Sequence, residues 1–161
     1  MEQLLTQTPP EWAAFAVQDF DAFLIDHASC ERKASAVGLS FVVRYPDRQA
    51  LLGPMIQFAR EELEHFHQVY RFIEARGLAL RPDEEDPYVN QFMQVVRTGR
   101  EERLLDRLLV SSLIEARGCE RLHLIAGVLT DEKLKAFYSR LARAEAHHQT
   151  LFADLALQYF P

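Results

Sequence analysis

The chain has 161 residues, of which 48% are hydrophobic and 26% are charged, and this length predicts a single domain over residues 1–161 with a sizeable core. Two cysteines exclude a disulfide scaffold, and the sequence has neither a signal-like N-terminus nor a run of about 18 apolar residues. We therefore expect a cytoplasmic protein without a membrane span. The formal net charge of −6 argues against a protein that coats nucleic acid through bulk positive charge.

Glycine and proline residues fall between long segments, and they predict four long helices. We expect the first helix to begin at Thr8, which can cap it, because Pro9 suits the first helical position and Glu11 completes a capping box. This helix should run to about Arg44, since Tyr45-Pro46 breaks it.

The second predicted helix is capped by Asp47 and ends at Gly77, with a kink at Gly53-Pro54. A long connection follows over residues 78–99, which contain two prolines and an acidic run. Within this connection we expect one short helix at 88–97.

The third predicted helix runs from about Arg100 to Leu129, and the fourth is capped and charged at its start by Thr130, Asp131 and Glu132. No segment shows the alternation typical of a strand. A short turn, a long crossover and a second short turn are the connectivity of an all-α, ferritin-like four-helix bundle.

Polar side chains occupy the middle of the apolar stripe on each long helix when residues are placed about 100° apart. The first and third helices each carry one such glutamate, and the second and fourth each carry a Glu-x-x-His motif. The set consists of Glu31, Glu62, His65, Glu115, Glu145 and His148. A carboxylate on a buried face must be paired or bind a ligand.

These residue types match the needs of a dinuclear metal site. Two iron or manganese ions require several anionic oxygen ligands and one imidazole for each metal. One glutamate from each of two helices and Glu-x-x-His from each of the other two supply those six ligands. The sequence therefore predicts that the six residues bind two metal ions.

The spacing tests this interpretation independently. In an antiparallel pair of helices, two residues meet at the same level if they are equally far from the turn. Glu31 precedes Pro46 by nearly the same number of residues as Glu62 follows it. In the other pair, Glu115 precedes Leu129 by nearly the same number of residues as Glu145 follows it. Both pairs are level within about one helical turn.

Two competing ligand assignments fail the same geometric test. Glu64 and His67 also form Glu-x-x-His, but they point away from the apolar stripe and should be exposed to solvent. Glu120 lies in Cys119-Glu120-Arg121, which repeats the string Cys30-Glu31-Arg32. Its direction differs from that of Glu115 by about 140°, and it is out of level with the fourth helix, so we keep Glu115.

Neighbouring residues are given simpler roles. We expect His27, one turn before Glu31, to be a hydrogen-bond partner or a satisfied core histidine rather than a seventh ligand. Cys30 and Cys119 are expected to be small buried packing residues. In a purely structural bundle, arginines would instead pair with the buried glutamates. The available arginines are Arg32, Arg117 and Arg121.

Longer strings around these residues resemble one family, and together they cover nearly the whole chain. They are Asp26-His27-Ala28-Ser29-Cys30-Glu31-Arg32-Lys33-Ala34, Arg44-Tyr45-Pro46, Arg60-Glu61-Glu62-Leu63-Glu64-His65-Phe66, Leu113-Ile114-Glu115-Ala116-Arg117, Cys119-Glu120-Arg121 and Glu145-Ala146-His147-His148. The chain is similar in these strings to the bacterial tRNA 2-methylthio-N6-isopentenyladenosine hydroxylases. Ferritins, rubrerythrins and manganese catalases share only the bare ligand set.

The resemblance implies a non-haem di-iron monooxygenase that hydroxylates the isopentenyl group of a modified adenosine beside the tRNA anticodon. Two iron ions would be the cofactor, O2 the co-substrate and tRNA the substrate. Catalysis would proceed through the di-iron centre held by Glu31, Glu62, His65, Glu115, Glu145 and His148. Because the chain has no Cys-x-x-Cys module, electrons would come from an external reductase or ferredoxin-type donor. The alternatives are a ferritin- or rubrerythrin-like protein that oxidises iron or handles peroxide, and a structural bundle. The oligomeric state stays open.

A tRNA substrate has to be reconciled with the acidic charge. Four of the carboxylates are assigned to metal in the core, so they should contribute little to the surface field. Of the 18 basic residues only three are lysines, and the arginines suit phosphate contacts and base stacking. The arginines closest together are Arg97, Arg100, Arg103 and Arg107 at the crossover, and Arg44 and Arg48 at the first turn.

Overall fold

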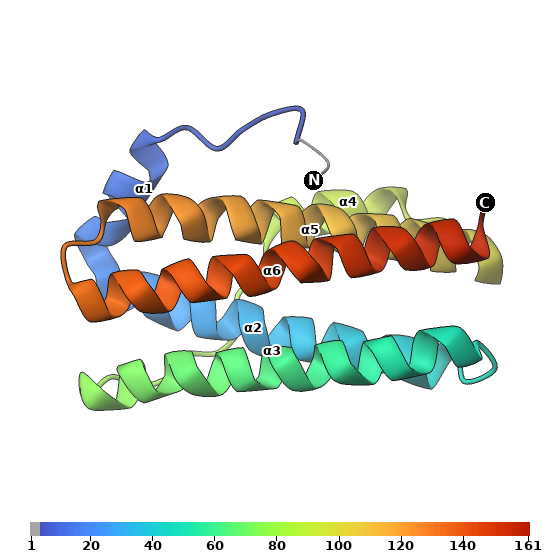
Figure 1. Ribbon diagram of the computed structural model, residues 1–161, viewed down its shortest axis with the longest axis horizontal. Coiled ribbons are helices and arrows are strands. Elements are labelled where there is room, and N and C mark those ends of the chain that lie inside the picture. The colour runs from blue at the N-terminus through green and yellow to red at the C-terminus, as the bar shows by residue number, and fades with distance from the viewer. Residues whose placement is uncertain (1–3) are drawn as a thin grey trace. The chain divides into compact units, whose positions relative to one another are not determined.

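The computed structural model describes residues 4–161, and over this range it contains helices and no strand (Figure 1). Two compact units are distinguished by their internal contacts. One is Gln18–Asp83, and the other joins the N-terminal residues up to Val17 with Glu84–Pro161. Among the described residues, no helix has the length and apolar character needed to span a membrane.

The first helical pair consists of α2 (Phe20–Arg44) and α3 (Gln49–Ala75), which pack against each other within the 18–83 unit. Its apolar stripes form a buried core. Side chains with no exposed surface in this core include Leu24, Phe41, Leu51, Met55, Val69 and Ile73. As predicted, α3 ends before Gly77, whose φ of +68° suits a residue without a side chain.

The backbones of α2 and α3 come close together at Gly38. A Cβ atom at this position would lie 2.8 Å from Cδ1 of Phe58 and 3.2 Å from the carbonyl oxygen of Met55. Glycine is therefore required here by the close approach of the second helix, since its backbone conformation is an ordinary helical one.

The prediction of one continuous helix from Thr8 to Arg44 is wrong. Helix α1 spans only Glu11–Ala16, a 3-10 turn covers Val17–Asp19, and α2 then begins. The reason is local competition by Asp19, whose carboxylate accepts the N–H of Ala22 at 3.0 Å and so starts a new helix. Thr8 does not cap α1, because its hydroxyl donates to Glu120 instead.

The predicted start of the second helix is also wrong in detail. Arg48 occupies the N-cap of α3 and makes no side-chain capping bond, while the carboxylate of Asp47 lies 4.0 Å from the Arg48 guanidinium. Helix α3 continues through Pro54. Proline is tolerated there because it lies near the start of the helix, where its missing N–H costs a single backbone bond.

The crossover contains the predicted short helix, α4, at Pro87–Val95. Asp86 caps it by accepting from the N–H groups of Tyr88 and Val89. The preceding loop is tied to α2 by Asp83, which accepts from the Ser29 hydroxyl and, at 2.7 Å, from the Arg32 guanidinium. The long connection is therefore held in place by hydrogen bonds rather than left as a free loop.

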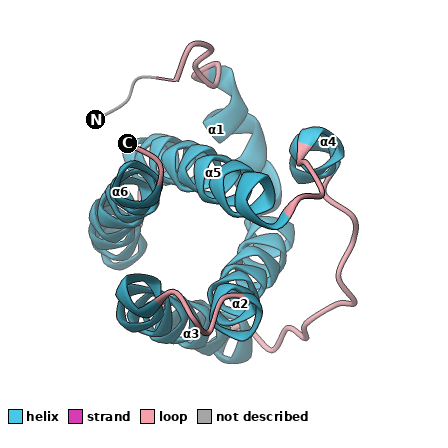
Figure 2. Cartoon of the chain, turned by 90° about the vertical axis from the view of Figure 1, so that its right-hand side faces the viewer, coloured by secondary structure: helices cyan, strands magenta, loops and turns pink. Residues whose placement is uncertain are grey.

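The second helical pair consists of α5 (Arg100–Val128) and α6 (Glu132–Tyr159), close to the predicted ranges. Asp131 caps α6 by accepting from Lys133 and Leu134, as the sequence indicated for this turn. Figure 2 shows α1 and α4 lying beside α5 in the same unit, and both helices contact it.

The N-terminal segment is anchored to α5 by a charged network. The carboxylate of Glu120 accepts from the Thr8 hydroxyl at 2.6 Å and from the Thr8 N–H at 2.9 Å. Arg117 donates to the same carboxylate at 2.5 Å and to the carbonyl oxygen of Thr6 at 2.7 Å. A cavity of about 630 Å³ lies between this segment and α5, with Pro9 and Cys119 in its lining.

Candidate metal centre

The first helical pair brings together three of the predicted ligands, Glu31 from α2 and both Glu62 and His65 from α3. All three side chains are buried, and Glu62 is only 1% exposed. The Nδ1 atom of His65 lies 3.7 Å from a carboxylate oxygen of Glu31 and 3.7 Å from one of Glu62. One imidazole therefore faces two carboxylates inside the protein.

The carboxylate of Glu31 is held in place by His27, one turn earlier on α2. The Nε2 atom of His27 lies 2.5 Å from Oε1 of Glu31. Burial by itself raises the pKa of Glu31, but the charge of His27 and hydrogen bonds from His27 and His65 outweigh it, so the pKa is lowered. The hydrogen-bonding role predicted for His27 is confirmed.

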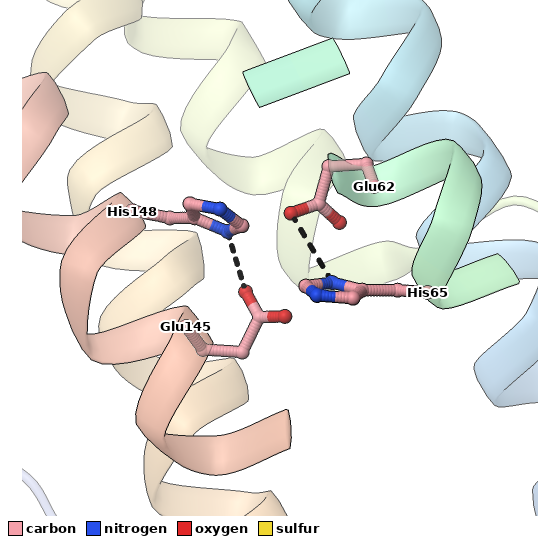
Figure 3. A group of neighbouring side chains, drawn as sticks. All are labelled: Glu62, His65, Glu145 and His148. Atoms are coloured by element: carbon pink, nitrogen blue, oxygen red, sulfur yellow. Dashed lines mark hydrogen bonds and ion pairs between the residues drawn. The ribbon is translucent and has the colours of Figure 1, made fainter. Parts of the chain in front are cut away.

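The second helical pair repeats the arrangement with Glu115 from α5 and both Glu145 and His148 from α6. These side chains are also buried. The Nδ1 atom of His148 lies 3.2 Å from a carboxylate oxygen of Glu145 and 4.0 Å from one of Glu115. Figure 3 shows the Glu145–His148 pair, and also the Glu62–His65 pair of the other unit.

The donor set fits a metal ion. Each helical pair buries two carboxylates with the imidazole of a Glu-x-x-His motif, and the first pair also buries His27 against Glu31. Buried carboxylates in such numbers need partners, and a metal ion would supply them. The side chains suited to hold a metal include Glu62, His65, Glu145 and His148. Carboxylate oxygens with imidazole nitrogens suit iron and manganese, whereas a zinc or copper thiolate site would require cysteine.

The arginines that would serve a purely structural bundle are engaged elsewhere. Arg32 donates to Asp83 at 2.7 Å, and Arg117 donates to Glu120. Arg121 lies over the ring of Trp12, with its guanidinium carbon 5.0 Å from the ring centroid. Ion pairing with these three arginines therefore does not account for the buried glutamates.

The rejected ligand assignments behave as expected. The side chains of Glu64 and His67 are 60% and 63% exposed. Glu120 accepts from Thr8 and Arg117 at the N-terminal anchor. The repeated Cys-Glu-Arg string therefore does not mark a second ligand.

The two cysteines differ. Cys119 is buried as predicted, and burial, followed by the charges of Glu145 and Glu120, raises the pKa of its thiol. The prediction that Cys30 is buried is wrong, because it is exposed. Cys30 immediately precedes Glu31, so it points about 100° away from the buried stripe.

Two hydrogen bonds between helices were not anticipated from the sequence. The hydroxyl of Ser35 donates to the carbonyl oxygen of Ala59 at 2.7 Å, and the thiol of Cys119 donates to that of Ala142 at 3.2 Å. The signal in the sequence is a small polar residue one turn after Glu31 and one turn after Glu115. Such a residue on a buried face needs an acceptor.

Comparison with known proteins identifies the family. The family model described as "tRNA-(MS[2]IO[6]A)-hydroxylase (MiaE)" matches residues 1–161. The chain belongs to this family. A MiaE relative from Pseudomonas putida, named tRNA 2-(methylsulfanyl)-N(6)-isopentenyladenosine(37) hydroxylase, is 39% identical over 152 residues, which are 94% of this chain and 74% of the relative. A relative of the same name from Salmonella typhimurium is 36% identical over 113 residues, 70% of this chain and 42% of that protein.

A solved structure resembles this chain along its whole length. It is described as "Protein 43 with aldehyde deformylating oxygenase activity from Synechococcus". The sequence identity is 38%, and the TM-score is 0.95 with 100% of this chain and 80% of that chain covered. The predicted fold class, an all-α ferritin-like bundle, is confirmed.

Proposed function

We propose that the protein is a di-iron monooxygenase that hydroxylates the isopentenyl group of 2-methylthio-N6-isopentenyladenosine next to the anticodon of tRNA. The observation that carries this proposal is membership of the MiaE family over the whole chain, together with two buried groups of carboxylate and imidazole ligands. The curated relatives bear the name of this activity.

In this proposal the six buried residues hold one pair of iron ions. Glu31, Glu62 and His65 supply one half of the ligands, and the second helical pair supplies the equivalent half. The four carboxylates together offset four positive charges of the metal pair, which also removes the cost of burying them alone. When bound, the iron pair supplies the two-electron activation of O2 that insertion into a C–H bond requires.

The overall reaction balances with an external electron donor. One oxygen atom of O2 enters a C–H bond of the isopentenyl group, and the other leaves as water after taking up two protons. The two electrons come from a separate reductase or ferredoxin-type protein, because the sequence holds no Cys-x-x-Cys module. We place this reaction in the cytoplasm, where its tRNA substrate is found.

The residues of this chain orient the ligands and exclude water. His27 holds the Glu31 carboxylate, which fixes the direction in which that carboxylate presents its second oxygen. Leu24 and Leu108 each lie two helical turns before the ligand glutamate of their helix, and neither has exposed surface. Such apolar surroundings keep an oxidant from reacting with solvent.

The basic residues of the crossover are candidates for phosphate contacts. Arg97 and Arg100 are exposed, and Arg103 and Arg107 are half-buried. The guanidinium of Arg97 donates to both carboxylate oxygens of Asp106, at 2.7 and 2.9 Å. Arg97 is therefore held in one direction with part of its surface facing solvent.

The test loads the apo protein with ferrous iron, adds reductant and O2, and incubates it with tRNA that carries the prenylated nucleoside. Mass analysis of the nucleosides should show a gain of one oxygen. Glu115→Ala and Glu145→Ala should abolish both the gain and the binding of two irons, while Glu64→Ala, an exposed glutamate on α3, should retain both. Iron that is rapidly oxidised and stored without any nucleoside product would refute the hydroxylase and favour a ferritin-like role.

A second candidate is oxidation of an aldehyde. It is favoured by the 38% identity to the Synechococcus protein described as having aldehyde deformylating oxygenase activity. The same reduced protein is therefore incubated with a long-chain aldehyde in place of tRNA. Turnover of the aldehyde with no change in tRNA would replace the proposed substrate while keeping the metal centre.

A further inference from the structure

The two helical pairs carry the same pattern of residues in the same register. In α3 the sequence runs Ala59-Arg60, then Glu62 and His65, and in α6 it runs Ala142-Arg143, then Glu145 and His148. In α2 Glu31 is followed one turn later by Ser35, and in α5 Glu115 is followed at the same spacing by Cys119. Every ligand of one pair therefore has a counterpart in the other.

One hydrogen bond between the helices of each pair also has an equivalent in the other pair. Ser35 donates to the carbonyl oxygen of Ala59, and its counterpart Cys119 donates to that of Ala142. Each donor lies one turn after the ligand glutamate of its helix, and each acceptor lies just under one turn before the glutamate of the neighbouring Glu-x-x-His. All four residues are buried.

The thiol of Cys119 has a second neighbour, which does not take its proton. The Nδ1 atom of His123 lies 3.6 Å from Sγ, but it lies 2.9 Å from the carbonyl oxygen of Cys119. Since a carbonyl only accepts, the nearer contact requires Nδ1 to carry the proton and donate it. The thiol proton is then available to the carbonyl oxygen of Ala142.

The Ser35–Ala59 and Cys119–Ala142 hydrogen bonds oppose sliding of the two helices of each pair along each other. A carbonyl oxygen in a helix already accepts one backbone N–H, and its second lone pair accepts the side chain from the facing helix. A shift of α2 along α3 by one residue would move Glu31 about 1.5 Å out of level with Glu62 and break the Ser35–Ala59 bond.

We propose that Ser35 and Cys119 are positioning residues, which hold the ligand glutamate of one helix level with the Glu-x-x-His motif of the next. The inference rests on the proposed di-iron function, since it concerns the same six ligands. Neither residue touches a metal; each acts through the register of its helical pair.

The two positions differ in how much else supports them. In the second helical pair the Ser112 hydroxyl also donates to the carbonyl oxygen of Gln149, at 3.1 Å, so the ligands lie between two interhelical bonds. The residue that corresponds to Ser112 in α2 is Ala28, which has no side-chain donor. Removing the Ser35 hydroxyl should therefore weaken metal binding more than removing the Cys119 thiol.

The experiment titrates the chelator-treated full chain with cobalt(II), which reports ligand geometry through its d–d absorption, and compares variants. Ser35→Ala should weaken cobalt binding about tenfold and alter the spectrum. Cys119→Ala should have a smaller effect in the same direction, and Cys119→Ser should restore the wild-type affinity and spectrum, because serine is the residue used in the other pair. Ser40→Ala is the matched control, since its hydroxyl bonds within α2 to Val37.

Wild-type affinity and spectrum in Ser35→Ala would overturn the inference. A Cys119→Ser variant that binds cobalt as weakly as Cys119→Ala would also overturn it, because lost packing rather than a lost hydrogen bond would then explain the weaker binding. If Ser35→Ala fails to fold, this comparison of the two Cys119 variants decides between the two explanations. Failure of the proposed function gives a different result, in which cobalt binding responds as expected but no tRNA nucleoside gains oxygen. A wild-type chain that binds no cobalt overturns both.

Discussion

Replacing Gly38 by alanine tests the close approach of α2 and α3. The new Cβ would lie 2.8 Å from Cδ1 of Phe58, 3.0 Å from Cβ of Ala59 and 3.2 Å from the carbonyl oxygen of Met55. The last two atoms belong to backbone or to a side chain that cannot rotate away, so the helices must separate by a few tenths of an ångström. Overpacking of this kind costs about 1–3 kcal/mol.

A second glycine provides the control for helix propensity. Gly118 lies inside α5, and a Cβ there would meet no atom within 4 Å. Gly118→Ala should therefore raise the free energy of unfolding by about 0.5–1 kcal/mol, since alanine is the better helix former. Gly38→Ala gains the same amount from propensity but loses more to the clash, for a net loss of about 1–2 kcal/mol.

Thermal unfolding of the metal-free protein, followed by circular dichroism, measures both variants. The two midpoint temperatures should move in opposite directions, by about 1–4 °C upward for Gly118→Ala and about 2–8 °C downward for Gly38→Ala. Gly38→Ala should also weaken metal binding, because it strains the Ser35–Ala59 bond one turn away. If the two substitutions stabilise the protein equally, the close contact between α2 and α3 is refuted.

Three further predictions concern charge, metal and capping. Burial alone raises the pKa of Glu120, but hydrogen bonds from Thr8 and Arg117 lower it below its ordinary 4.5. The charged Glu120 therefore stabilises the anchored N-terminal segment above pH 4.5, and this stabilisation is lost as the pH falls through the lowered pKa. Glu120→Gln should speed exchange of the Thr8 amide hydrogen at pH 7, because that N–H donates to the Glu120 carboxylate, and the difference from wild type should shrink as the pH falls through the lowered pKa of Glu120; a difference that does not change with pH would contradict the charge argument. Ferrous or manganous ion at 100 times the wild-type Kd should raise the free energy of unfolding by about 2.7 kcal/mol for each ion bound, and a Glu62→Ala variant that gains as much at the same ion concentration would remove Glu62 from the ligand set. Asp131→Ala should cost about 1 kcal/mol in a thermal melt by removing the cap of α6, whereas no loss would show that Asp131 contributes nothing there.

Sequence periodicity was sufficient to predict four long helices, apart from the break before Phe20, and the burial of the candidate ligands. Glu31, Glu62, Glu115 and Glu145 interrupt otherwise apolar stripes, and the structure buries every one of them. A carboxylate in such a stripe is a strong signal because burial without a partner is so costly. The use of the six residues as ligands stays a prediction.

Local capping choices were harder to predict. Thr8 had the sequence signature of a cap, yet its hydroxyl finds a charged acceptor on Glu120, 112 residues away. Asp19, which had no assigned role, starts α2. Both outcomes depend on tertiary contacts or on competition between adjacent caps, and a pattern of residue types in one segment contains neither.

The anchor between Thr8 and Glu120 also bears on the order in which the protein folds during synthesis. Thr8 leaves the ribosome before α5 does, since its acceptor Glu120 is made 112 residues later. At about 5–20 residues per second, that delay is roughly 6–22 seconds. Through this interval the first helical pair can form on its own, while residues 4–8 have no acceptor on α5. These residues can therefore dock only once α5 has been made, and the cavity between them and α5, whose lining includes Gln149, can form only after that part of α6 has been made as well.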